Sequence, residues 1–343
     1  QVRMKPGSYE VTKIYSENPK VIFRFSGSNN RFDLTGVTLR IDTKVHASMP
    51  LGNAHEHSGF LVDGDHIEFI GGVFEDIGNL PAPRGINEFT VLGNDNRFKD
   101  CRIIIRGSSP YGYGDLYGKG RGAATRLQKH CAMSVLGDRT LIDGCDFKVH
   151  AFGHGIHIHG SQDTVVRNVT MEGVLRLTDE IYREKTGLAA KYDHKMMYPP
   201  WLKGRPIPKG KMLSLTEDGI RAYLDGSDRD GNTRRTGHIT VENCVVKRMR
   251  GGITITMAKS GTVTDCVVLE SGGHAYSIPP NGVVRDCKGD AGFSPLLSMP
   301  YSNRGNADIE LELVAAEEEL GDHPLAKVVG NGHRIRITSS GDG

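Results

Sequence analysis

Hydrophobic and polar residues alternate over short stretches along most of the chain, and each stretch contains Gly, Asp or Asn. The stretches include FDLTGVTLR, NRFKDCRIII, TLIDGCDFKV, ITVENCVVKR and GTVTDCVVLE. Alternation with a period of two is typical of strands that bury one face, and Gly, Asp and Asn favour turns. The pattern predicts many short strands separated by tight turns.

These stretches repeat at a regular spacing. Each carries Val or Cys directly after its Gly, Asp or Asn, and these landmark positions are Val37, Val73, Cys101, Cys145, Val169, Cys244, Cys266 and Cys287. The last two steps are 22 and 21 residues, and longer steps fit a coil with an inserted loop. A strand-and-turn repeat of this length is typical of a β-solenoid. An antiparallel β-sandwich also has many short strands, but it does not predict a Cys at one phase.

A second strand precedes most of the landmarks and usually ends in Gly. Aligned on these glycines, the residues that point into the coil are Phe60/Val62, Phe89/Val91, Met133/Val135, Ile156/Ile158, Ile220/Ala222 and Ile253/Ile255. The alternate residues of each strand must then face outward.

This organisation resembles the right-handed parallel β-helices of the pectate-lyase-like superfamily. The opening MKPGSYEV is similar to their first turn, and the repeat pattern covers about residues 5 to 305. The resemblance implies an all-β, single-stranded right-handed parallel β-helix with long loop insertions. We therefore expect one domain over 1–343, with insertions at 106–130 and 176–236 that border a cleft. The superfamily includes lyases, hydrolases, epimerases and phage tailspikes, so the fold alone selects no activity.

The stretch GHGIHIHG at 153–160 places two histidines on the outward face. By the same alignment, His157 and His159 lie beside Arg221 and Tyr223 of the next coil. His, Arg and Tyr within reach of one another can serve as general base, charge neutraliser and proton donor. We interpret these four residues as catalytic; the alternative is a face that is polar only because it is solvated.

Both expected insertions mix aromatic residues with Lys and Arg. Aromatic rings stack on sugars, and cations bind carboxylates or sulfates. We expect substrate contacts from Arg126, His130, His154, Tyr192, His194, Lys195 and Trp201. Packing of the loops against the coil is the alternative for each of them. Residues 176–215 are expected to lie over the outward face near His157.

Six cysteines are present, and three of them occupy consecutive landmarks. In a parallel β-helix, Cys244, Cys266 and Cys287 would point inward from strands about 4.8 Å apart, slightly too far for good disulfide geometry. We expect them to be buried thiols.

The segment GHGIHIHGSQ also resembles the Gly-His-Gly motif of polygalacturonases, with His154 at the matching position. Those hydrolases need clustered aspartates on the preceding coils, where this chain has Thr90 and Ser134. The departure removes the acid and base of that mechanism. Carboxylates follow later, at Glu217, Asp218 and Asp225.

Two segments have the composition of metal sites. HEH at 55–57, with His130 and the histidines of 154–159, could supply imidazoles to a transition metal. DGSDRDGN at 225–232 is rich in oxygen ligands but lacks the downstream Glu of an EF-hand. We expect no metal and no cofactor, with a bound divalent cation as the alternative.

Composition narrows the partners. The net charge of +2 gives no bulk attraction to nucleic acid, and no apolar run has the length of a membrane span. The chain begins at Gln1 without an initiating Met. We expect a secreted or periplasmic protein that binds an anionic polysaccharide or oligosaccharide.

Together these features predict a polysaccharide lyase, an enzyme of polysaccharide degradation that cleaves a uronic-acid-containing glycan by β-elimination. The main alternative is a glycoside hydrolase that uses two of the carboxylates Glu217, Asp218 and Asp225. A third interpretation is a non-catalytic, glycan-binding β-helix.

Overall fold

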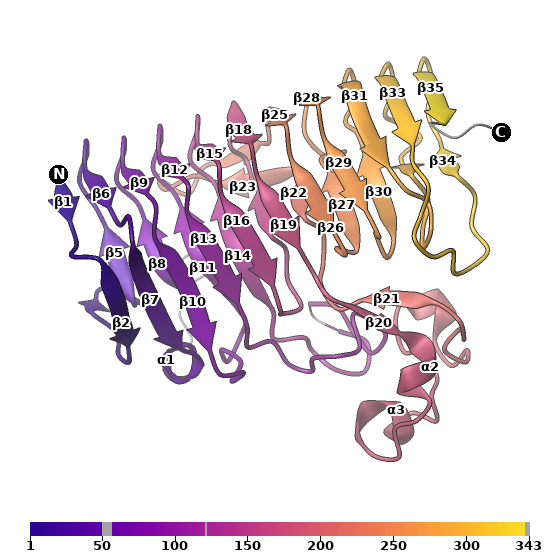
Figure 1. Cartoon of the computed structure of the whole chain (residues 1–343), viewed down its shortest axis with the longest axis horizontal. Coiled ribbons are helices and arrows are strands. Elements are labelled where there is room, and N and C mark those ends of the chain that lie inside the picture. The colour runs from indigo at the N-terminus through magenta and orange to yellow at the C-terminus, as the bar shows by residue number, and fades with distance from the viewer. Residues whose placement is uncertain (50–56, 121, 340–343) are drawn as a thin grey trace.

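The computed structural model describes residues 1–49, 57–120 and 122–339 and is a right-handed parallel β-helix (Figure 1). One face is a parallel sheet of ten strands. In order they are β5 (Phe23–Phe25), β8 (Ser58–Val62), β11 (Ile86–Val91), β14 (His130–Val135), β17 (Ile156–Ile158), β22 (Ile220–Ala222), β27 (Gly251–Thr254), β30 (His274–Ser277), β32 (Leu297–Met299) and β34 (Ala326–Val328).

The other two faces belong to a 19-stranded sheet made of two parallel rows that join at β31. The first row contains β1 (Val2–Arg3), β6 (Arg31–Asp33), β9 (Glu68–Ile70), β12 (Arg97–Lys99), β15 (Leu141–Asp143), β18 (Thr164–Arg167), β25 (His238–Glu242), β28 (Ser260–Thr264), β31 (Val283–Gly289), β33 (Asp308–Leu313) and β35 (Arg334–Ser339). The second contains β2 (Gly7–Val11), β7 (Val37–Asp42), β10 (Val73–Ile77), β13 (Arg102–Ile105), β16 (Asp146–Val149), β19 (Thr170–Glu172), β26 (Val245–Lys247) and β29 (Val267–Leu269).

Each turn before a landmark residue adopts a left-handed backbone conformation. The residues with positive φ are Gly36, Gly72, Asp100, Gly144, Asn168, Asn243, Asp265 and Asp286, each directly before a landmark Val or Cys. Gly, Asn and Asp are the residues that adopt this conformation most readily. The recurring Gly, Asp or Asn of the repeat is therefore the corner that turns the chain from one row of the large sheet into the next.

The inward residues form one continuous core. Phe60, Phe89, Met133, Ile156 and Ile220 are all fully buried. They follow one another in register through β8, β11, β14, β17 and β22, as the glycine alignment predicts. Stacking of like side chains on successive coils thus supplies the hydrophobic stabilisation of the helix.

All six cysteines are buried free thiols. The Sγ atoms of Cys244, Cys266 and Cys287 lie 3.2, 3.1 and 3.1 Å from the backbone carbonyl oxygens two residues earlier. They act as small core residues whose S–H groups have partners.

Two insertions leave the coil and pack on each other. The loop between β13 and β14 joins an excursion of β20 (Leu175–Leu177), α2 (Thr178–Ile181), α3 (Gly187–Lys191), η2 (Pro200–Leu202) and β21 (Met212–Ser214). Their shared apolar core contains Leu116, Tyr117, Ile181, Ala189, Met196 and Ile207. The excursion projects from one side of the helix (Figure 1).

Three smaller features complete the described chain. α1 (Thr43–Ser48) follows β7, and Asp42 caps its first turn by accepting the Lys44 N–H. Two hairpins are formed by β3 (Ser16–Glu17) with β4 (Lys20–Val21) and by β23 (Asp225–Ser227) with β24 (Thr233–Arg235). Among the described residues, no helix is both long and apolar enough to cross a membrane.

Candidate functional site

The outward residues of the ten-stranded sheet lie in register. Through six strands they are Leu61, Thr90, Ser134, His157, Arg221 and Thr254, which we call the outward row. His157 is paired directly with Arg221 on the neighbouring strand. The alignment made from the sequence therefore placed these side chains on the correct face and in the correct order.

His157 and His159 form a hydrogen-bonded pair. His157 Nδ1 lies 2.7 Å from His159 Nε2, and His157 Nε2 lies 3.0 Å from Asn87 Oδ1. Since an amide oxygen only accepts, His157 Nε2 carries a proton and its Nδ1 accepts the proton of His159 Nε2. The pair therefore has a defined tautomeric order that starts at Asn87.

His157 is more enclosed than a solvated outward residue. Its exposed fraction is 8%, because His154, His159 and Tyr223 surround its ring. Burial, together with the nearby His159 and His154, lowers its pKa well below the usual value. His157 is therefore neutral at neutral pH, and its ring is covered and hydrogen-bonded.

Tyr223 occupies the next outward position after Arg221 and stacks on His159, with ring centroids 4.3 Å apart. Its Oη lies 2.9 Å from His154 Nε2. The His154 Nδ1 accepts the Asp218 N–H at 3.1 Å, so Nε2 bears the proton and donates to Tyr223. Burial and Glu217 raise the pKa of Tyr223, which keeps its hydroxyl protonated.

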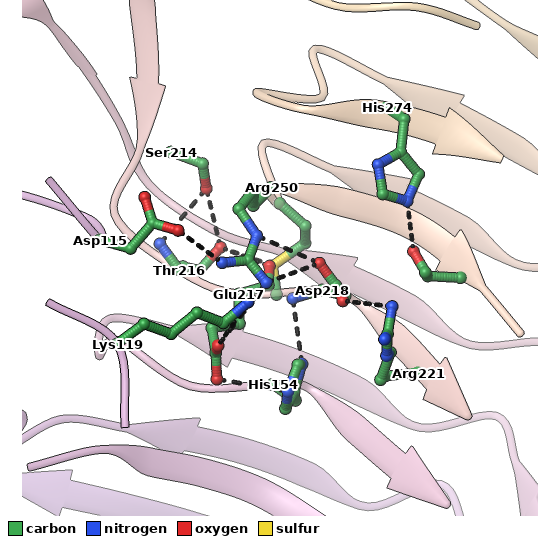
Figure 2. Close-up of polar contacts among 12 residues, drawn as sticks. Asp115, Lys119, His154, Ser214, Thr216, Glu217, Asp218, Arg221, Arg250 and His274 are labelled. Carbon is green, nitrogen blue, oxygen red and sulfur yellow. Dashed lines mark hydrogen bonds and ion pairs between the residues drawn. The ribbon is translucent and has the colours of Figure 1, made fainter. Parts of the chain in front are cut away.

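Two buried carboxylates, Glu217 and Asp218, come just before β22 and form ion pairs with Lys and Arg side chains (Figure 2). Glu217 Oε2 is 2.6 Å from Lys129 Nζ, and Asp218 Oδ1 is 3.2 Å from Arg250 Nη2. Asp218 Oδ2 also lies 3.3 Å from Arg221 Nη1. These ion pairs hold Lys129 and Arg250 beside the outward row and fix the side chain of Arg221 within it.

The ion pairs keep both carboxylates charged. Burial alone would raise the pKa of Glu217, but His154, Lys129 and Arg250 lower it to about 2. The same balance, with Arg250, His154 and Arg221, holds the pKa of Asp218 far below its usual range. Neither side chain is a proton donor near neutral pH.

Two grooves border the site, and Glu217 forms an ion pair with one lysine from the lining of each, Lys129 and Lys119. The first, which we call the Lys129 groove, has a volume of about 460 Å³ and is lined by Arg84, Asn87, Arg126 and Lys129 among others. The second, the Arg221 groove, has a volume of about 340 Å³, and its lining includes Lys119, Trp201, Arg221, Arg250 and His274. Both are bordered by cations, which suits an extended anionic ligand.

The Arg221 groove contains polar atoms that lack a partner in the described chain. Arg221 Nε and Thr256 Oγ1 are buried and make no hydrogen bond there. Buried polar groups are normally satisfied, so these two are available to a bound ligand or water.

The proposed substrate residues are distributed unevenly. His154 lies at the centre of the site, Arg126 lines the Lys129 groove, and Trp201, 77% exposed, lines the Arg221 groove. This places the excursion beside Arg221. His130 lies elsewhere, fully buried with Asp76 and Glu88.

Three other proposed substrate residues belong to the excursion and line neither groove. Tyr192 stacks on Tyr117 in the small apolar core. His194 stacks on Tyr182, and Lys195 is exposed beside Asp193. The structure therefore places Tyr192 and His194 in packing contacts and Lys195 at the surface.

Sequence reasoning missed Asn87, Lys119, Lys129, Arg250 and His274. Asn87 and His274 share a signal with His154 and Asp218, since each stands two residues before the first inward residue of its strand. Extending the glycine alignment by these positions would have found them. The three cations carry no such signal, because ion pairs, not periodicity, define their places.

The two segments considered for metals have different outcomes. His55 and Glu56 lie outside the described residues. In the 225–232 segment, Asp228 accepts the backbone N–H groups of Asp230 and Asn232 and closes the β23–β24 turn. Asp225 is exposed at the start of this hairpin. Among the described residues, one group has the make-up of a metal site, His46 with Asp76, Glu88 and His130.

No family model matches the sequence, and no curated protein matches it. The alginate lyase AlyF-OU02, solved with G6, is 12% identical, with 96% of this chain and 78% of that chain covered and a TM-score of 0.43. A PL6 alginate lyase solved with a trisaccharide is 12% identical over 97% of this chain and 74% of that one, with a TM-score of 0.38.

A third solved structure is the A-module of the mannuronan C-5 epimerase AlgE6 of Azotobacter vinelandii. It is 9% identical over 99% of this chain and 91% of that chain, with a TM-score of 0.32. The architecture of the chain is the parallel β-helix that the sequence predicts.

Proposed function

We propose that this protein is a polysaccharide lyase that cleaves a uronic-acid-containing glycan by β-elimination. The reaction removes the proton from the ring carbon that bears the carboxylate and expels the glycosidic oxygen from the adjacent carbon, so that a C=C bond forms between the two carbons. It needs a cation to stabilise the developing enolate, a base for the proton and an acid for the leaving oxygen. The observation that carries the proposal is the grouping of Arg221, Tyr223 and two histidines on one face, beside carboxylates fixed in their charged form.

Arg221 is the proposed carboxylate neutraliser. Its guanidinium lines the groove, and its Nε has no partner in the described chain. A planar guanidinium can hold a carboxylate through two parallel hydrogen bonds. Asp218, at 3.3 Å from Nη1, orients the side chain without using Nε.

His159 is the proposed base and Tyr223 the proposed acid. In the tautomeric order set by Asn87 and His157, the unprotonated nitrogen of His159 is Nδ1. The Tyr223 hydroxyl accepts from His154, so its own proton can go to the glycosidic oxygen. The stacked rings keep the acid and base side by side.

The charge state of the carboxylates favours a lyase over a glycoside hydrolase. A hydrolase needs one protonated carboxylic acid with a raised pKa beside a second carboxylate. Glu217 and Asp218 have lowered pKa values and are fully buried in ion pairs. Asp225 lies on the exposed β23–β24 hairpin.

The decisive experiment is incubation with a panel of acidic polysaccharides that includes alginate and pectate. Elimination creates unsaturated uronate ends, which absorb ultraviolet light. Absorbance that rises with new reducing ends supports the proposal. New reducing ends without absorbance indicate a hydrolase, and binding without cleavage indicates the non-catalytic alternative. A polymeric substrate also fits the proposed secreted or periplasmic location.

A further inference from the structure

Four ionisable side chains, none of which is a proposed catalytic residue, gather in the helix interior. They are His46 on α1, Asp76 on β10, Glu88 on β11 and His130 on β14, and we call them the His46 cluster. Each side chain is at most 1% exposed. One potential ligand atom from each of the four lies within 4.8 Å of the others.

Several polar atoms of the His46 cluster have no hydrogen-bond partner. They are both ring nitrogens of His46, Oδ1 of Asp76 and Oε1 of Glu88. An unsatisfied polar group in an apolar interior costs roughly 1–3 kcal/mol, and a charged group costs more. Four such atoms in one place indicate that something polar belongs between them.

The backbone fixes His130 in the tautomer of a metal ligand. Its Nδ1 contacts the carbonyl oxygen of Arg106, so that nitrogen bears the proton. Its Nε2 then presents a lone pair towards Glu88 Oε2, at 3.2 Å. A histidine that donates one N–H to a carbonyl and aims the other nitrogen at a shared point has the arrangement found around bound metals.

Two of the spacings between the potential ligand atoms fit tetrahedral coordination. Glu88 Oε2 lies 3.2 Å from His130 Nε2 and 3.4 Å from His46 Nε2. Zinc–ligand bonds of 2.0–2.1 Å at tetrahedral angles place neighbouring ligand atoms about 3.4 Å apart. Asp76 is held ready by the Arg106 N–H, which its Oδ2 accepts at 2.8 Å, while Oδ1 has no partner.

Charge balance also calls for a cation. Within the described residues, neither Asp76 nor Glu88 forms a salt bridge with a Lys or Arg; the two histidines are their only ion-pair partners. A proton on His130 would satisfy its contact with Glu88, but it would leave both ring nitrogens of His46 and Oδ1 of Asp76 without partners. A divalent cation would neutralise both carboxylates and use the orphaned atoms.

We propose that His46, Asp76, Glu88 and His130 bind a divalent first-row transition metal of the zinc type, which fastens α1 to three successive coils. Two imidazoles and two carboxylates suit zinc better than calcium or magnesium, which prefer oxygen ligands alone. Complete burial leaves no position for substrate, so the role is structural.

The test measures metal content and metal-dependent stability of the intact protein. Elemental analysis after dialysis against Zn²⁺ and removal of the excess should find about one metal per chain. Removal by a strong chelator should lower the unfolding temperature by several degrees, and Zn²⁺ should restore it. Co²⁺ added to the metal-free protein should give the visible absorption of a tetrahedral N/O site.

Two variants place the metal at the cluster. His46→Ala and Glu88→Gln should each weaken binding at least about 100-fold, since loss of an outer-shell partner alone costs 10–100-fold. His238→Ala, a half-buried histidine on β25, is the matched control and should bind as the unaltered chain does. If either variant fails to fold, chelation and Co²⁺ addition with the unaltered chain decide the matter.

Two results would overturn the proposal. The first is a chain that takes up neither Zn²⁺ nor Co²⁺ and whose unfolding temperature is insensitive to chelator. The second is metal binding that His46→Ala and Glu88→Gln leave unchanged. The readouts do not involve polysaccharide cleavage, so they are independent of the proposed lyase activity.

Discussion

At the scale of single residues, a network of neutral rings sets the chemistry. His154 donates to Tyr223, and His159 donates to His157, which in turn donates to Asn87. Each ring therefore has an assigned tautomer, and the Tyr223 hydroxyl keeps a proton that it can donate. His159 and Tyr223 are the proposed proton-transfer groups, while Lys129, Arg221 and Arg250 supply positive charge.

Tyr223→Phe should reduce kcat by roughly 100-fold or more, the range typical of a lost general acid. The ring still stacks on His159, and His154 Nε2 keeps Glu217 Oε2 as a partner at 3.3 Å, so the unfolding temperature should change little. Arg221→Lys should also impair turnover, because a point charge does not replace a planar fork. Steady-state kinetics on the cleaved glycan and thermal unfolding check both. Full activity of Tyr223→Phe would move the acid role to another group.

His157→Ala should lower the free energy of unfolding by about 1–3 kcal/mol, because it leaves Asn87 Oδ1 and His159 Nε2 without their partner in an enclosed site. Denaturant unfolding measures the change. A loss within about 0.5 kcal/mol would mean that the ring is solvated after all.

Buried histidines also predict the direction of a pH effect. Burial lowers the pKa of His154 and of His274 to about 4. In the unfolded chain they titrate near 6.5, so the unfolded state binds more protons below that pH. The free energy of unfolding should fall as the pH falls from about 6.5 towards 4.5. His274→Asn should make the decline shallower, and an unchanged slope would contradict the assigned burial.

At the scale of elements, the turns position the site. Asp265 has a φ of 53°, a conformation that Asp tolerates better than β-branched residues do. The same type of corner recurs before every landmark, which keeps the strands in register. That register is what pairs His157 with Arg221.

Asp265→Val should destabilise the protein by about 1–2 kcal/mol, because a β-branched side chain is strained at positive φ. Asp265→Gly is the matched control and should be neutral or nearly so. Denaturant unfolding of the two variants gives the comparison. Equal stability of the Val and Gly variants would show that the corner is not conformationally selective.

Periodicity explains which elements could be predicted. Strand alternation and the corner residues determine the coil, so the inward core and the outward row followed from sequence. The excursion has no period, and Tyr192 and His194 pack inside it for reasons that only its tertiary path reveals. His130 was assigned to the cleft because it ends the 106–130 insertion, whereas the structure turns it towards His46.

At the scale of the whole molecule, the β-helix carries the outward row, and the two insertions pack together on one side of it. The insertions share their own apolar core, and Trp201 projects from it into the Arg221 groove. Binding surface and proton-transfer groups are thus carried by different parts of the chain. This separation predicts that they can be altered independently.

Trp201→Ala should raise KM several-fold while leaving kcat and the unfolding temperature nearly unchanged. The ring is 77% exposed, so its loss removes a stacking surface for sugars but little packing. Kinetics over a range of glycan lengths tests this, with Leu80→Ala as an exposed apolar control outside both grooves. An unaltered KM would place the substrate away from the excursion.

The central claim is that this face breaks a glycosidic bond by elimination. Mass spectrometry of the oligosaccharides released from the preferred acidic polysaccharide tests it most directly. The account predicts that one end of each cut carries an unsaturated uronate, lighter by one water than the product of hydrolysis, and that Tyr223→Phe suppresses its formation. Products that all carry the mass of hydrolysis would contradict the account.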